Sequence, residues 1–284
     1  MNPVAHAVRV GLRRGWTEFV LGLRSGQDQG YYLFVGLGVL AYLWINRTGE
    51  VEGTDLLYPT VALPSILGGF LVFGMVIGPA FALVMEKEDG TLLRAKATPH
   101  GLVGYVTGQV VYHSLSILPL LLVILVPSAL LFDDAVRLGA ADWLLLVPLG
   151  LLAMVAALPV GLVLGAVVPN TQKMGTYGFF PVIALFTISG IFFPMQVLWQ
   201  WVQVVAQVFP MYWTGLAMRS VFLPDSAAAL EITGTWRTVE TFAVLGAWAV
   251  VGLLVATVVL RRMARRQSGS AVKGARERAG QFVR

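Results

Sequence analysis

The chain has 284 residues, of which 57% are hydrophobic and only 12% are charged, with a net charge of +5. This composition excludes a soluble globular domain, and several uncharged runs exceed the ~20 residues that a helix needs to cross a bilayer. Cysteine is absent and the three histidines match no zinc spacing, so we expect no disulfide, metal or cofactor in this chain.

Residues 1–29 predict a cytoplasmic amphipathic helix. Their arginines, such as Arg9 and Arg13, and the lack of a continuous apolar core argue against a cleaved signal peptide. The apolar side chains share one helical face: Val8, Leu12, Trp16, Phe19, Val20 and Leu23. This pattern favours a helix lying in the membrane interface, and the alternative is a surface helix packed on a soluble domain.

Residues 30–260 predict an all-α membrane domain of six transmembrane helices. A membrane β-barrel is not expected, because its alternation of apolar and polar residues is absent. The first span, 31–45, is short for a bilayer and must gain length or thin the membrane. The other spans are expected at about 59–85, 102–131, 143–168, 175–193 and 239–260.

The apolar and aromatic segment 194–223 lies before the last span and is broken by Pro210. Two short helices, 197–208 and 211–222, fit it as a re-entrant or interfacial hairpin, and the alternative is one further full span. Aromatic side chains suit headgroup depth, and we expect this of Trp199, Trp201, Tyr212 and Trp213. The hairpin residues singled out are Pro194, Trp199, Trp201, Pro210, Tyr212 and Arg219.

The distribution of Lys and Arg predicts that both termini are cytoplasmic. With six spans, four of the 20 basic residues face outside, namely Arg47, Arg137, Arg219 and Arg237, and the rest face the cytoplasm. Residues 261–284 form a basic cytoplasmic tail. Because this tail directly follows a span, we expect it to face lipid and not nucleic acid.

The segment 86–100 between the second and third spans is a charged loop. Gly90 can end a helix in the left-handed conformation, Thr91 can cap a short helix from Leu92, and Thr98-Pro99 can start the next span. We therefore predict a short cytoplasmic helix whose charges are available to a soluble partner. A simple solvated loop is the alternative.

Catalytic motifs are absent from the chain. There is no GxxxxGK[ST] phosphate loop, HExxH or GxSxG motif, so we expect a transport subunit that does not hydrolyse ATP itself, and no enzyme. Only His113 lies well inside a span, one turn after Gln109. A polar pair that hydrogen-bonds between helices is the favoured interpretation, and a proton relay is the alternative.

The segment from Glu86 to Pro99 resembles the E-[RK]-E-x-G-T-L…T-P signature of ABC-2 type transporter permeases, especially the daunorubicin-resistance-like drug-exporter permeases. The resemblance extends to Ser189-Gly190-Ile191-Phe192-Phe193-Pro194 and to the segment 209–219, and it covers nearly the whole chain. The sequence differs from the common family pattern at two places, and both bear on the assignment to the drug-exporter subgroup. Gln109 stands where a glycine-lysine pair is common after Gly108, and Phe209-Pro210 replaces a frequent Asn-Pro.

The resemblance implies a type V exporter fold in the bacterial inner membrane, with a coupling helix that docks on a separate ATPase subunit. ATP and magnesium would bind that subunit, and a second permease copy or a homologous permease would complete the pathway. The ATPase-coupling residues carried over are Glu86, Lys87, Glu88, Gly90, Thr91, Leu92, Arg94, Thr98 and Pro99, with Trp16, Glu18 and Arg24 on the N-terminal helix.

The resemblance also implies that the transporter exports an amphipathic drug-like or lipid-like molecule. A polysaccharide or glycolipid exporter is the alternative within the family. A secondary transporter is less favoured, because the spans lack buried charges and an inverted repeat. An intramembrane enzyme acting on lipid ranks lowest, because the chain offers only isolated hydroxyls as nucleophiles.

Overall fold

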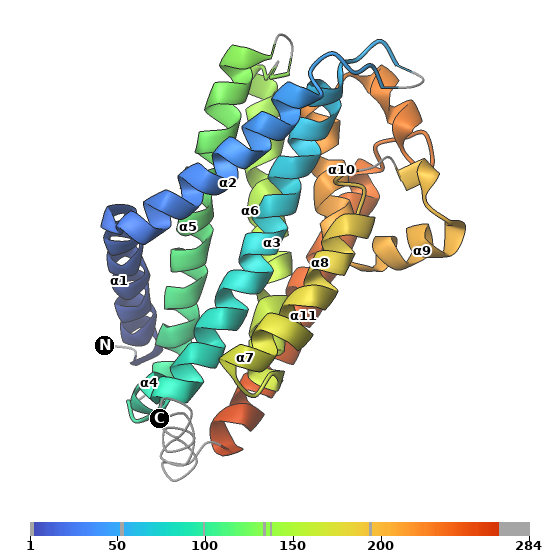
Figure 1. The fold of residues 1–284 in the computed structure, drawn as a ribbon. Coiled ribbons are helices and arrows are strands. Elements are labelled where there is room, and N and C mark those ends of the chain that lie inside the picture. The colour runs from blue at the N-terminus through green and yellow to red at the C-terminus, as the bar shows by residue number, and fades with distance from the viewer. Residues whose placement is uncertain are drawn as a thin grey trace.

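The computed structural model describes residues 3–51, 54–98, 100–132, 135–136, 138–192 and 195–266. Most of these residues are helical, and the one β-type contact among them is an isolated bridge between Glu50 and Leu57. The predicted all-α membrane fold is therefore confirmed. Figure 1 shows long helices side by side, with α4 at one end of the bundle and the α5–α6 connection at the other. We name these the α4 end and the far end.

The helices, in chain order, are α1 (Pro3–Arg24), α2 (Gly26–Ile45), α3 (Tyr58–Asp89), α4 (Thr91–Lys96), α5 (Gly101–Leu131), α6 (Ala140–Val167), α7 (Thr171–Lys173), α8 (Phe179–Ile188), α9 (Gln200–Val208), α10 (Pro210–Phe222) and α11 (Thr238–Arg266). A π-helical turn, Met174–Gly178, joins α7 to α8, and 3-10 turns occupy Met195–Val197 and Asp225–Leu230.

Among the described residues, four helices are long and apolar enough to cross a membrane: α3, α5, α6 and α11. They contain four of the six predicted spans. The other two predicted spans fall on α2 and on the continuous helical segment 171–188, which are shorter. A total of six spans stays a prediction.

Helix α3 lies at the centre of the bundle and is buried along most of its length. It approaches α6 closely, because a methyl group at Gly165 would lie 2.7 Å from the carbonyl oxygen of Ala80. Small residues at such positions let membrane helices come into backbone contact, where packing replaces the missing hydrophobic driving force. Helices α3 and α6 therefore form one tightly packed unit.

The two predicted helices before the last span are present as α9 and α10, and α10 begins at Pro210, a favourable first helical residue. Trp199 and Trp201 are exposed, as expected for headgroup depth, but Tyr212 and Trp213 are buried. Those two residues are buried because α10 packs among α3, α6 and α11, and the headgroup depth of all four aromatic residues stays a prediction. Pro194 lies outside the described residues, and re-entry into the membrane stays a prediction.

The N-terminal helix α1 packs against the first turns of α5 through small residues. A methyl group at Gly15 would lie 2.6 Å from the carbonyl oxygen of Gly108. The apolar face predicted from the sequence points away from this contact, with Leu12 and Trp16 exposed. Helix α1 thus packs one face on α5 and leaves an apolar face exposed, and its position in the membrane interface stays a prediction.

The local structure of the charged loop differs from expectation at its end. Gly90 is left-handed, with φ 80°, and ends α3 as predicted, and the Thr91 amide that begins α4 donates to the Asp89 carboxylate. Thr98 does not cap α5. Its hydroxyl donates to the Ala95 carbonyl, 2.8 Å away, which closes the end of α4, and α5 starts only after His100. Pro99 and residues 267–284 of the predicted tail lie outside the described residues.

Candidate functional site

Three consecutive charged residues at the end of α3 each bind a different part of the chain. Glu86 binds α1 and α5, Lys87 binds the end of α6, and Glu88 binds the start of α7. The sequence suggested charges that are available to a soluble partner. The structure shows that these three side chains are half-buried and that they connect the helices at the α4 end to one another.

Glu86 is the centre of a polar chain that crosses three helices. Its Oε1 accepts from Arg14 of α1 at 2.9 Å and from Gln109 of α5 at 3.5 Å. Arg14 also donates to Glu18 at 2.7 Å, and Gln109 bonds His113 at 2.8 Å. These five residues form the α4-end cluster. The predicted Gln109–His113 pair lies within α5, and the bond between helices is the one from Gln109 to Glu86.

Arg14 is the residue of the α4-end cluster that the sequence analysis did not single out. Burial lowers the pKa of its guanidinium, but hydrogen bonds and charges from Glu18 and Glu86 outweigh burial and raise that pKa above the ordinary value. The group is therefore permanently charged. It also lies over the Tyr105 ring, 5.7 Å from the centroid, which adds a cation–π contact to α5.

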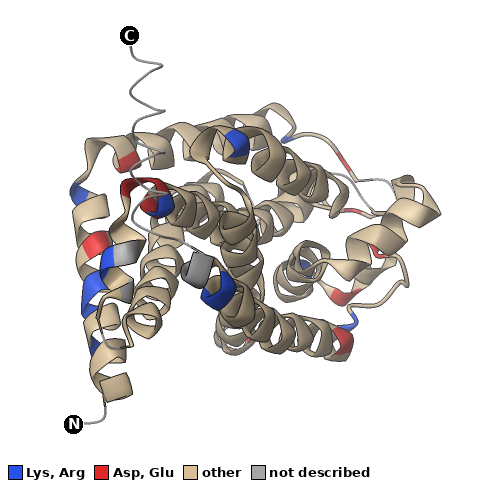
Figure 2. Cartoon of the chain, turned by 90° about the horizontal axis from the view of Figure 1, so that it is seen from below, with Lys and Arg blue, Asp and Glu red and all other residues tan. Residues whose placement is uncertain are grey.

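The remaining predicted coupling residues lie on two separate surfaces. Leu92 is buried and anchors α4, whereas Arg94 is exposed and donates to the Thr91 hydroxyl at 3.0 Å. Trp16 and Arg24 are exposed on α1. Figure 2, seen from the α4 end, shows charges along the helix that starts at the N-terminus, whereas most of the other helices are uncharged.

A cleft of about 690 Å³ separates α1 from the turn between α4 and α5. Its walls include Ala7, Gly11 and Arg14 from α1, and Thr98 and Tyr105 from the other side. The small residues leave space between these elements, and Arg14 places one charge at its wall. A protein segment that inserted here would touch α1 and the α4–α5 turn at once.

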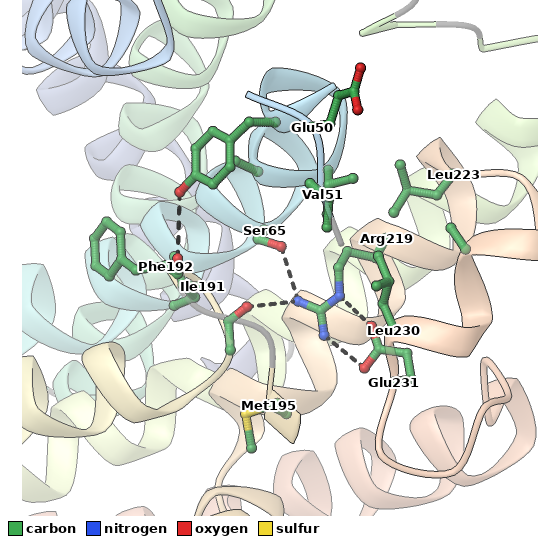
Figure 3. Close-up of a pocket in the computed structure, with 15 residues that line it drawn as sticks. Glu50, Val51, Ser65, Ile191, Phe192, Met195, Arg219, Leu223, Leu230 and Glu231 are labelled. Carbon is green, nitrogen blue, oxygen red and sulfur yellow. Dashed lines mark hydrogen bonds and ion pairs between the residues drawn. The ribbon is translucent and has the colours of Figure 1, made fainter. Parts of the chain in front are cut away.

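A second ion pair is buried at the far end of the bundle (Figure 3). Arg219 of α10 binds Glu231 through two hydrogen bonds, of 2.5 and 3.2 Å. Its remaining nitrogen donates to the Ser65 hydroxyl at 3.0 Å and to the Gly190 carbonyl at 3.1 Å. These four residues form the far-end cluster, which lines a cavity of about 150 Å³.

The far-end cluster gives Arg219 a role that the sequence did not predict. Arg219 was placed on the hairpin, but Glu231, Ser65 and Gly190 were not connected with it. A buried guanidinium needs a carboxylate partner. The segment between Arg219 and the last span holds two acidic residues, Asp225 and Glu231. Within that segment, the rule would have left these two as candidate partners of Arg219.

The family model for ABC-2 type transporters matches residues 19–223, which include α3, α4, the whole of α5 and α10. The chain belongs to the ABC-2 type transporter family. This ABC-2 protein is therefore a multi-pass membrane subunit of an ABC transport system, and the drug-exporter subgroup stays a prediction. A search of curated proteins finds no match. Arg14 and Glu231 lie outside the matched region, although each is paired with a residue inside it.

Hydrogen bonds and ion pairs hold the two clusters together. Among the described residues, no group of three or more His, Asp or Glu side chains gathers to hold a metal ion. The α4-end cluster joins helices beside a cleft, and the far-end cluster fastens α10 to α3. Both arrangements suit the transmission of movement between helices.

Proposed function

We propose that this ABC-2 protein is the permease of an ATP-driven exporter and that a separate ATPase subunit docks on α4 and α1. The observation that carries the proposal is the position of Glu86, in the last turn of α3 that leads into α4 and bonded to both α1 and α5. A displacement of α4 would reach three long helices through this one side chain. The cleft between α1 and the α4–α5 turn offers the partner a place to insert.

The chain needs an external source of energy. It carries no phosphate loop, so ATP and magnesium would bind the partner, and closure of two ATPase subunits would move α4. A second permease copy, identical or homologous, would complete the pathway. The excess of basic residues on the α4 side supports cytoplasmic termini in a bacterial inner membrane.

An amphipathic drug-like or lipid-like substrate agrees with the apolar character of the helices. A groove of about 360 Å³ runs between α5 and α6 over α3 and α10, and its walls are apolar, including Leu122, Trp143, Leu151 and Met218. Such walls favour acyl or aromatic groups over sugar hydroxyls, which would lose their hydrogen bonds to water. This observation supports the drug-like or lipid-like substrate over a polysaccharide.

The proposal is tested by transport into inverted vesicles that contain the chain with its partner ATPase. A fluorescent cationic dye and a fluorescent phospholipid analogue serve as probes, with and without ATP. We expect ATP-dependent accumulation of at least one probe and its loss in Glu86→Ala. Accumulation that survives ATP depletion and collapses with the proton gradient would instead indicate a secondary transporter, with His113 as the first residue to replace.

A further inference from the structure

The end of α6 is held by a side chain of α3. Lys87 donates to the carbonyl oxygens of Gly165 at 2.6 Å, Val168 at 2.5 Å and Ala166 at 3.4 Å. The last carbonyls of a helix lack partners within it, and a cation at this end also interacts favourably with the helix dipole. Lys87 thus satisfies several carbonyls of one helix end at the same time.

The next residue of α3 holds the start of the following helix. The Thr171 amide donates a hydrogen bond to Oε1 of Glu88 at 3.2 Å, and the Thr171 hydroxyl donates one to Oε2 of Glu88. A carboxylate is favourable at the beginning of a helix for the same electrostatic reason that a lysine is favourable at the end. Two adjacent residues of α3 therefore hold both sides of the α6–α7 turn.

The helix that follows this turn changes character at the π-helical segment Met174–Gly178. Met174 is fully buried and packs with Ala80 and Val84 of α3, whereas Tyr177 is 71% exposed. A π-helical turn interrupts the regular hydrogen bonding of a helix and is a common site of bending. The π-helical segment therefore lies between α7, which Glu88 holds to the end of α3, and α8.

Helix α8 rests on α3 through aromatic rings. The Phe73 ring contacts Phe179 and Phe186, with centroids 5.9 and 5.3 Å apart. The α3–α6 contact is different, because glycine there brings the two backbones together. Side chains can change rotamer when two helices shift, whereas backbones in direct contact are close-packed and transmit the shift. We therefore expect α8 to tilt relative to α3 more readily than α6.

We propose that Lys87 and Glu88 are positioning residues that carry a displacement of α4 into α8, by fixing the α6–α7 turn to the end of α3. The proposal rests on the proposed function, because it assumes that an ATPase moves α4. In this arrangement α7 moves together with the end of α3, and the chain bends at the π-helical turn so that α8 tilts. Glu86 transmits the displacement to α1 and α5, whereas Lys87 and Glu88 transmit it to the α7–α8 segment.

Distance measurements between spin labels test this proposal, because the chain has no cysteine of its own. The reference label is at Val239, which is 80% exposed and lies at the start of α11, a helix to which Glu86, Lys87 and Glu88 make no hydrogen bond among the described residues. It is paired in one sample with a label at Tyr177 and in another with a label at Arg94. The full complex with its ATPase is placed in lipid nanodiscs, and the distances are compared with ADP bound and after trapping with ATP and vanadate.

We expect both distances to shift on trapping in the otherwise unmodified chain. In a Lys87→Met/Glu88→Gln double variant, the Arg94 distance should still shift and the Tyr177 distance should not. Lys87→Arg should keep both shifts, because a guanidinium also donates to carbonyls. Lys173→Met is the matched control. Lys173 is an exposed lysine close to the same turn, and its side chain makes no hydrogen bond or ion pair among the described residues.

The outcomes show whether this inference fails alone or together with the proposed function. If the Tyr177 distance shifts fully in the double variant, or is constant in the unmodified chain while the Arg94 distance shifts, the role of Lys87 and Glu88 is overturned and the proposed function stands. If neither distance shifts in the unmodified chain, both are overturned. The Arg94 shift in the double variant also shows that the variant is folded and docked.

Discussion

The α4-end and far-end clusters each contain an arginine paired with a carboxylate, but they differ in burial. At the α4 end the side chains of Arg14 and Glu86 are 32% and 15% exposed. At the far end those of Arg219 and Glu231 are 6% and 4% exposed, and the two make a doubly hydrogen-bonded pair. The same two kinds of side chain therefore work in two electrostatic environments.

Burial decides what each cluster does for the protein. Removing one partner from a buried pair leaves an uncompensated charge in a medium of low dielectric constant, which is strongly unfavourable. A partly exposed pair can exchange its bonds for water at little cost. The far-end cluster is thus a fixed connection between α10 and α3, and the α4-end cluster can rearrange when a partner moves α4.

The largest expected effect is the loss of one partner in the far-end cluster. Arg219→Leu should lower the free energy of unfolding by about 3–5 kcal/mol, because Glu231 remains buried without its counter-charge. Titration of the purified protein with a denaturing detergent measures this change.

The matched double variant Arg219→Leu/Glu231→Leu separates charge from packing. It should recover most of the lost stability, because no isolated charge is left in the interior. A single variant as stable as the unmodified chain would show that the pair is not buried in the folded protein, and the contrast between the two clusters would disappear.

A smaller effect is expected where α1 meets α5. Gly15→Ala places a methyl group 2.6 Å from the Gly108 carbonyl oxygen, so the two helices must separate, at a cost of about 1–3 kcal/mol. Gly30→Ala is the control, because nothing lies within 4 Å of a methyl group there. It should be neutral or slightly stabilising, since alanine is the better helix former. Equal melting temperatures for the two variants would contradict the close α1–α5 contact.

The smallest effect on stability is expected at the α4 end. A double-mutant cycle of Arg14→Ala and Glu86→Ala should give a coupling energy of about 1 kcal/mol, at the upper end of the range for exposed pairs, because Arg14 is 32% exposed and Glu86 only 15%. Transport in the vesicle assay should nevertheless fall in both single variants. A coupling energy as large as that of the far-end pair would show that the α4-end cluster is also a fixed connection.

The sequence predicted most helices well because long apolar runs, prolines and one glycine mark their limits. Helix α3 ends at Gly90 and α10 begins at Pro210, as expected. The burial of α10 could not be predicted in the same way. A helix inside a membrane bundle and a helix in the membrane interface have similar compositions, so Tyr212 and Trp213 fit both places until tertiary contacts are known.

The candidate site was predicted in parts and not as a whole. The motif identified Glu86, Lys87 and Glu88, but a run of charges does not tell which helices its side chains reach. One available signal was missed. Gly-x-x-x-Gly spacing occurs at 11–15, 22–26, 26–30, 49–53, 74–78, 104–108 and 161–165. The pairs 11–15, 74–78, 104–108 and 161–165 lie at close helix contacts, whereas a methyl group at Gly26 or Gly30 would meet nothing within 4 Å. That spacing would have named the glycines at the α1–α5 and α3–α6 contacts as candidates, together with glycines that make no such contact.

The most direct test of the account is crosslinking from α4 to the ATPase subunit. In the cysteine-free chain, Arg94→Cys places a reactive group on the exposed side of α4, and Thr48→Cys places one in the loop before α3 at the far end. The account predicts a crosslink to the ATPase from Arg94→Cys alone, and labelling of that cysteine only from the cytoplasmic side. A crosslink from Thr48→Cys, or labelling of Arg94→Cys from outside the cell, would contradict both the topology and the coupling role of α4.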